Sequence, residues 1–222
     1  MNTITKILMP LLFVGLFAAC KNDKSKDATV SAEKAVATVS DKSYTVDADL
    51  TKVMWIGAKP AGTHNGTVNV TSGNVTTKDG NISGGSFTID MTSINCLDLE
   101  GGSKEGLEAH LKGTESGKED DFFNVAKYPT AKFAITKVTK LENNPDASHM
   151  IFGNLTIKDV SKNVGFRANV KSMNSMVEVT TPEFTINRTD WGIKYGSKSF
   201  FDNLKDKFID DEIKLSINLI AK

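Results

Sequence analysis

The stretch from Ile151 to Val170, IFGNLTIKDVSKNVGFRANV, has the most regular pattern in the chain. In both of its halves, apolar side chains alternate with polar ones. The apolar set is Ile151, Leu155 and Ile157, followed by Val164, Phe166, Ala168 and Val170. Because successive side chains of a strand point to opposite faces, this alternation predicts two β-strands that each bury one face.

The same alternation recurs on both sides of this stretch. It is found in SFTIDM (Ser86–Met91), AKFAIT (Ala131–Thr136), FTINR (Phe184–Arg188) and EIKLSINLI (Glu212–Ile220). SGN at Ser72–Asn74 and KDGN at Lys78–Asn81 are typical of turns between strands. Roughly eight to ten strands in an antiparallel meander form either a two-sheet sandwich or a closed barrel, and the alternation fits both.

Helical periodicity is confined to short segments. SKEGLEAHLKG (Ser103–Gly113) predicts the main helix, with Ser103 capping its first turn and Leu107 and Leu111 on one face. A second, shorter helix is predicted through SFFDNLKD (Ser199–Asp206). The protein is therefore predicted to be mainly β, with one or two short helices.

Five stretches together resemble one known family. They are WIGAKPAGTHNG (Trp55–Gly66), GGSFTIDMTSI (Gly84–Ile94), LEAHLKG with DDFFNVAKYPTAKF (within Leu107–Phe133), GNLTIKDVSKNVGF (Gly153–Phe166) and FTINRTDWGI (Phe184–Ile193). Their order and content resemble the YceI family of polyisoprenoid-binding proteins, across nearly all of residues 43–222. The insert around Ser103–Gly117 departs from the simplest members.

The resemblance implies a lipocalin-like, extended antiparallel β-barrel over residues 43–222. In that family an apolar channel holds a long isoprenoid chain, so an isoprenoid or another long-chain lipid is the implied partner. Members are secreted or periplasmic and some are dimers, which extends the expectation to a homodimer. The expected function is a membrane-tethered lipid carrier, buffer or sensor, and no cofactor is implied.

The inward-facing apolar positions are the candidates for lining such a channel. They are Phe87, Ile89, Met91, Phe133, Ile135, Leu155, Ile157, Phe166, Phe184 and Ile186. The same pattern describes a solid core, and periodicity alone favours the core. The family resemblance is what favours a channel.

Two polar–aromatic motifs are interpreted as structural. Asp121, Phe122 and Phe123 are expected to form a short helical turn, which the acidic residue caps and the two aromatic rings pin to the barrel. In RTDWG, which contains Trp191, the side chains of Arg188 and Asp190 are expected to form a salt bridge or to bond the backbone near the barrel mouth.

The N-terminus has the three parts of an export signal. Lys6 precedes an apolar run from Ile7 to Ala19, which is too short to span a bilayer, and small residues precede Cys20. Residues 1–19 are therefore predicted to be a signal peptide. The junction resembles a bacterial lipobox, which implies lipidation of Cys20; an ordinary cleaved signal with an incidental cysteine is the alternative.

Residues 20–42 are predicted to be the lipidated cysteine and a flexible tether, because their polar, alanine-rich sequence lacks aromatic side chains. The protein is thus expected to be an exported bacterial lipoprotein, attached to the membrane by its N-terminal lipid. Lys21 rather than an acidic residue follows the cysteine, which favours the outer membrane, facing the periplasm or the cell surface.

Composition and motif spacing exclude several functions. The 27 basic and 27 acidic residues balance, and the sequence has no basic cluster interleaved with aromatic residues. Nucleic-acid binding is therefore not expected. His64, His110 and His149 lack metal-ligand spacing, and no G-x-S-x-G motif is present, so neither a metal site nor catalysis is expected. Cys96 is interpreted as a buried structural residue. A β scaffold or adhesion lipoprotein is the main alternative, and a metalloenzyme a weaker one.

Overall fold

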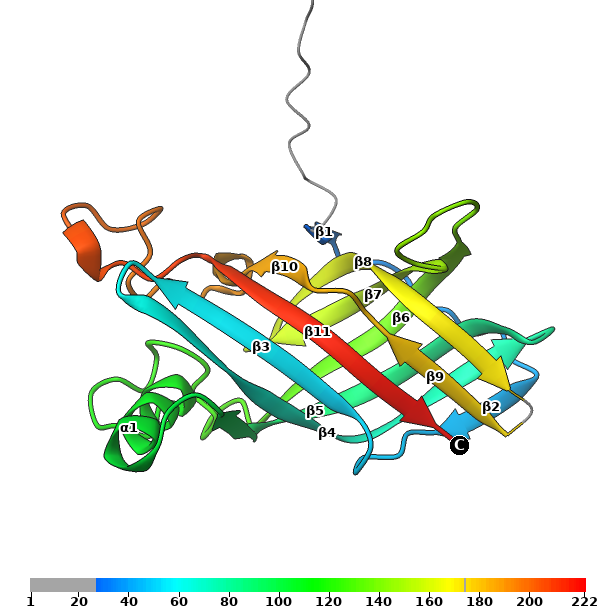
Figure 1. Ribbon diagram of the computed structural model, residues 1–222, viewed down its shortest axis with the longest axis horizontal. Helices are drawn as coiled ribbons and strands as arrows, with labels where there is room; N and C mark the ends of the chain where they lie inside the picture. The colour runs from blue at the N-terminus through cyan, green and yellow to red at the C-terminus, as the bar shows by residue number, and fades with distance from the viewer. Residues whose placement is uncertain (1–26, 174) are drawn as a thin grey trace, which may run out of the picture.

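A computed structural model describes residues 27–173 and 175–222, and within them the chain forms a closed, elongated antiparallel barrel (Figure 1). The eight strands of the ring are β3 (Lys52–Lys59), β4 (Gly62–Lys78), β5 (Asn81–Cys96), β6 (Thr130–Lys140), β7 (His149–Ile157), β8 (Val160–Met173), β9 (Met176–Thr180) and β11 (Glu212–Ala221). Strand β11 pairs with both β3 and β9 and so closes the ring. The barrel predicted by the family resemblance is confirmed, and the sandwich is excluded.

Two of the hairpins turn through a pair of residues with positive φ. Lys158 (φ 48°) and Asp159 (φ 60°) join β7 to β8, and Asp79 (φ 50°) and Gly80 (φ 76°) join β4 to β5. Such turns match the twist of the flanking strands. The turn predicted at Ser72–Asn74 is wrong, because β4 runs through it with only an irregularity in register.

A row of aromatic rings packs inside the barrel. The ring centroids of Phe87 and Phe133 are 6.3 Å apart, those of Phe133 and Phe166 are 5.6 Å apart, and those of Phe166 and Phe184 are 4.6 Å apart. Gly153 makes room for this row, since a Cβ there would lie 2.2 Å from the Phe133 ring. The glycine of the GNLTIK stretch is thus required by close packing.

Strands β8 and β11 do not pair with each other, and different strands fill the space between them at the two ends of the barrel. At one end β9 pairs with both strands. At the other, β10 (Phe184–Asn187) pairs with β11, and β1 (Thr29–Ala32) pairs with β8. The backbone N–H of Ala28 donates to the carbonyl of Thr185 at 2.9 Å, which joins the N-terminal segment to β10. Residues before the predicted domain therefore complete the barrel wall.

The described part of the predicted tether, residues 27–42, is thus ordered against the barrel, which corrects the expectation of a flexible segment. Beyond β1, the Asn154 side chain accepts from the backbone N–H of Lys34 (3.0 Å) and donates to its carbonyl (2.6 Å). Strand β2 (Lys42–Thr45) then pairs with β4. Backbone pairing needs no aromatic side chains, and composition therefore did not reveal it. The predicted signal peptide, 1–19, and Cys20 lie outside the described residues.

The main helix, α1 (Gly101–Lys112), lies at the end of the barrel beside the last part of β5 (Figure 1). Leu107 and Leu111 lie on one face of the helix, as their spacing predicts, and both line a cavity inside the barrel. Ser103 is not the cap: the helix begins two residues earlier, and the N-cap Glu100 makes no side-chain capping bond. Among the described residues, no helix has the length and apolar character needed to cross a membrane.

The helix predicted through Ser199–Asp206 does not form. This segment contains only the start of a short 3₁₀ turn, η3 (Lys205–Lys207). Asn203 (φ 65°) and Lys205 (φ 49°) have left-handed backbone conformations that interrupt a helix. A second 3₁₀ turn, η2 (Arg188–Trp191), follows β10.

Candidate ligand cavity

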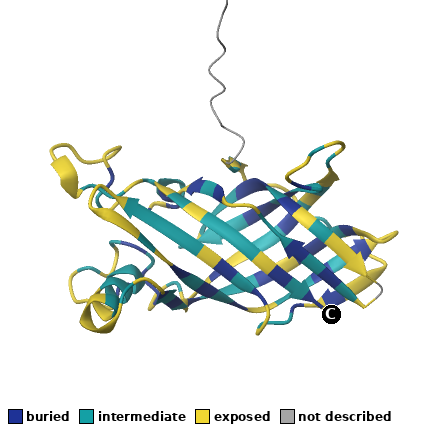
Figure 2. Ribbon diagram, viewed as in Figure 1, coloured by how far each residue is buried: buried dark blue, intermediate teal, exposed yellow. Residues whose placement is uncertain are grey.

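A cavity of about 560 Å³ lies inside the end of the barrel that α1 covers. Its wall is mostly apolar and includes Trp55 of β3, Met91 of β5, Leu111 of α1 and Leu215 of β11. The residues of β3 and of the first part of β11 are mostly half-buried here, whereas buried residues gather at the other end (Figure 2). The barrel therefore encloses space at one end and packs its own side chains at the other.

A narrower apolar cavity of about 60 Å³ continues toward the β9 end. Phe87, Phe133 and Phe166 of the aromatic row line it. Val53 and Ile89 contribute to the walls of both cavities, so only side chains separate the two spaces.

The predicted channel residues are distributed over the two cavities. Those lining the large cavity are Ile89, Met91, Leu155, Ile157 and Ile186. Those lining the small cavity are Phe87, Ile89, Phe133, Ile135 and Phe166. Phe184 lines neither cavity and stacks on Phe166 instead, with an angle of 9° between the ring planes.

Polar groups gather at the mouth of the large cavity. The Nε2 atom of His110 lies 2.7 Å from a carboxylate oxygen of Asp121, and its ring packs edge-on against Phe122 and Tyr195. The predicted helical turn at residues 121–123 is wrong: the chain makes a non-helical turn there, and the Asp121 carboxylate pairs with the histidine and caps no helix. Phe122 is buried and Phe123 packs on the core, as predicted.

Arg188 holds together the segment that borders this mouth. Its side chain is 2 % exposed, and its guanidinium lies 3.4 Å from the Asp211 carboxylate. It also donates to the backbone carbonyls of Ile193, Ile209 and Asp210. Burial lowers the pKa of Arg188. The predicted backbone bonds are confirmed, but the ionic partner is Asp211 rather than Asp190, which stays half-buried nearby.

Trp191 connects the same turn to the barrel wall. Its indole is 1 % exposed, and its Nε1 donates to the carbonyl of Leu155 at 3.0 Å. The RTDWG motif thus closes the barrel beside the cavity, in agreement with its structural interpretation.

Residues 44–221 of this chain match the YceI-like domain family. The chain belongs to the YceI family. A comparison with curated proteins gave no match. Among solved structures, BcnA of Burkholderia cenocepacia is similar, with a TM-score of 0.60 and 18 % identity over 80 % of this chain and 99 % of that one. A polyisoprenoid binding domain from Saccharophagus degradans, implicated in plant cell wall breakdown, has a TM-score of 0.58 and 13 % identity, covering 81 % and 97 %.

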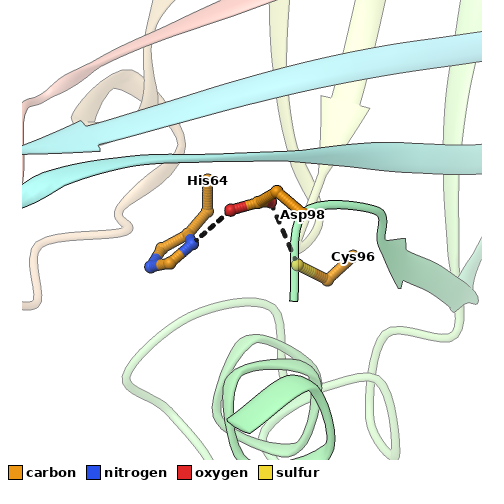
Figure 3. Close-up of side chains that lie close together, drawn as sticks. All are labelled: His64, Cys96 and Asp98. Carbon is orange, nitrogen blue, oxygen red and sulfur yellow. Dashed lines mark hydrogen bonds and ion pairs between the residues drawn. The ribbon is translucent and has the colours of Figure 1, made fainter. Parts of the chain in front are cut away.

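This YceI-family barrel also carries a cluster that sequence reasoning missed (Figure 3). His64 Nδ1 lies 2.8 Å from Asp98 Oδ2, and the Cys96 thiol donates to Asp98 Oδ1 at 3.3 Å. The hydrogen bond from the backbone N–H of Asn65 and, to a smaller extent, the hydrogen bond with the His64 ring lower the pKa of Asp98 to about 2. Burial raises the pKa of the Cys96 thiol. His64 and Asp98 are far apart in sequence, and no spacing motif joins them; the pairing of β4 with β5 brings them together.

Proposed function

We propose that the protein binds a long, mostly apolar lipid of the isoprenoid class inside the barrel. The observation that carries this proposal is the apolar cavity of about 560 Å³. Ligand pockets in proteins span roughly 300–1,000 Å³ and are lined mostly by apolar side chains. The description of the similar Saccharophagus domain as polyisoprenoid binding supports the same class of ligand.

The distribution of charge orients the ligand. Ionisable residues on the large cavity's wall, such as His110 and Lys207, lie at the α1 end, whereas nearly all side chains around the small cavity are apolar. A polar head group buried without partners is costly, so the head belongs at the mouth and the tail inside. A longer tail reaches the small cavity past Val53 and Ile89.

The energetics favour exchange with a membrane over permanent retention. Moving a five-carbon isoprene unit from water into the cavity contributes about 3–4 kcal/mol. A bilayer already removes the tail from water, so transfer from membrane to barrel is nearly neutral in its hydrophobic part. A carrier, buffer or sensor requires this reversibility, and we assign the protein to that group of binding proteins rather than to enzymes.

The identity of the cargo is tested by native mass spectrometry of protein purified from its own cells, followed by organic extraction. We expect a bound mass that is released into the organic phase and contains repeating five-carbon units. A protein that is empty as purified, and that takes up no polyprenol from detergent, would instead be a filled β scaffold.

We further propose that the protein is exported and held at the outer membrane through a lipid on Cys20. The support is the apolar run that ends in small residues before this cysteine. From Cys20 to Asp27, where the described chain begins, even an extended backbone spans at most about 25 Å. Because the following residues pair with β8, such an anchor would keep the barrel close to the lipid surface from which it draws its ligand.

Lipidation is tested by metabolic labelling with a clickable palmitate. We expect label on the wild type and none on Cys20→Ser, with the wild type in the membrane fraction and the variant outside it. Cys96→Ser is the matched control and should keep the label, since Cys96 is buried in the barrel. Label that persists on Cys20→Ser would contradict the anchor while leaving the ligand proposal intact.

A further inference from the structure

A group of potential metal ligands lies at the rim of the large cavity, where β4 meets the end of β5 beside α1 (Figure 3). We propose that His64, Cys96 and Asp98 form a binding site for a divalent transition metal of the zinc class. Nothing in the polyisoprenoid-binding proposal requires such a site, and the inference stands on the geometry of these three side chains alone.

The ligand atoms are already gathered. The imidazole nitrogen, the thiol sulfur and a carboxylate oxygen all lie within 4.8 Å of one another. A tetrahedral zinc ion with bonds of about 2.0–2.3 Å holds its ligand atoms roughly 3.3–3.8 Å apart. The distance of 3.3 Å from Cys96 Sγ to Asp98 Oδ1 lies at the lower end of that range, and the distance of 2.8 Å from His64 Nδ1 to Asp98 Oδ2 is shorter than it. An ion would therefore have to move the His64 and Asp98 side chains slightly apart.

The donor set selects the class of metal. Calcium and magnesium prefer oxygen ligands, whereas one nitrogen, one sulfur and one oxygen suit zinc and its neighbours in the first transition row. Three protein ligands leave a fourth position for water, as in zinc sites that remain open. Since His64 also lines the large cavity, an ion bound here would lie at the cavity rim.

Backbone and side-chain bonds hold the ligands in place. The backbone N–H of Asn65 donates to Asp98 Oδ1 at 2.7 Å, and that of Cys96 donates to the Glu108 carboxylate of α1 at 2.9 Å. Partners of this kind orient metal ligands and contribute to affinity. Cys96 is fully buried, while the side chains of His64 and Asp98 are 27 % and 25 % exposed, so an ion can approach from their side.

Binding is balanced by the loss of one proton and two hydrogen bonds. The Cys96 thiol gives its proton to solvent, and the neutral His64 ring carries its proton on Nε2, which leaves Nδ1 free to bind the ion. The metal then replaces the His64–Asp98 and Cys96–Asp98 hydrogen bonds. This proposal replaces the expectation, drawn from histidine spacing, that the domain binds no transition metal. Spacing motifs report ligands on one helix or loop, whereas these come from β4, from the last residue of β5 and from the segment that follows β5.

The test is titration of full-length, reduced and chelator-treated protein with cobalt(II) chloride and then with zinc(II) chloride. We expect one equivalent of cobalt to give a thiolate-to-metal charge-transfer band, and zinc to displace it. His64→Gln and Asp98→Asn should each weaken affinity at least about 10-fold, and Cys96→Ser should also abolish the band. Circular dichroism verifies that each variant is folded.

Two controls separate this site from other thiols and imidazoles. Cys20→Ser leaves Cys96 as the only cysteine, and His149→Gln removes a histidine on β7 outside the cluster; both should bind cobalt like the wild type. Absence of saturable binding would overturn the proposal. So would a band that persists unchanged in folded His64→Gln and Asp98→Asn. Lipid extraction is measured separately and is expected to be unaffected by the chelator.

Discussion

Replacing Arg188 by methionine should lower the free energy of unfolding by about 3–5 kcal/mol, because the change leaves buried polar partners unpaired. The guanidinium donates hydrogen bonds to three backbone carbonyls and lies 3.4 Å from the Asp211 carboxylate. Methionine fills similar space but offers no donor, so these acceptors lose the hydrogen bonds that the buried Arg188 side chain donates. Urea denaturation followed by circular dichroism measures the difference.

Arg167→Met is the matched control. Arg167 is half-buried on β8 and alternates with the inward Phe166 and Ala168, so its side chain lies on the outer face. We expect a change of only about 0.5 kcal/mol there. If Arg188→Met cost no more than this control, the bonds around the cavity mouth would contribute little to stability, and the assignment of the RTDWG turn as a structural clasp would be wrong.

Leu155→Asp should abolish lipid binding while the barrel stays folded. Leu155 is half-buried and lines the large cavity, where water can remain beside a carboxylate when no ligand is present. An apolar tail has to displace that water and leave the charge unsolvated, so the variant should lose most of the lipid that the wild type retains. Organic extraction and thermal unfolding of the same sample give the two readouts.

Val164→Asp provides the opposite outcome for comparison. Val164 is 1 % exposed and lines neither cavity, so a carboxylate at this position would not be hydrated. Its cost of several kcal/mol is a large share of the roughly 5–15 kcal/mol that stabilises a typical domain, and we expect this variant to unfold. Unfolding of both variants would indicate a solid interior at Leu155. Retention of lipid by folded Leu155→Asp would place the ligand elsewhere.

The local elements of the barrel could be predicted because neighbouring residues determine them. The alternation through Ile151–Val170 predicts strands, and the structure has β7 and β8 there. Likewise, Leu107 and Leu111 lie on the cavity-facing side of α1. Periodicity did not distinguish a barrel from a sandwich, since both bury one face of each strand. The family motifs predicted the barrel correctly.

The sequence by itself thus determined the strands, the helix and the family, because side-chain alternation and local motifs act over a few residues. Only the tertiary structure decided which interior positions face a cavity, that β1 completes the wall beside β10, and that Arg188 pairs with Asp211. It also brought His64 next to Asp98. Each of these depends on pairing and closure between distant segments, and the free energy of such contacts leaves no periodic pattern along the chain.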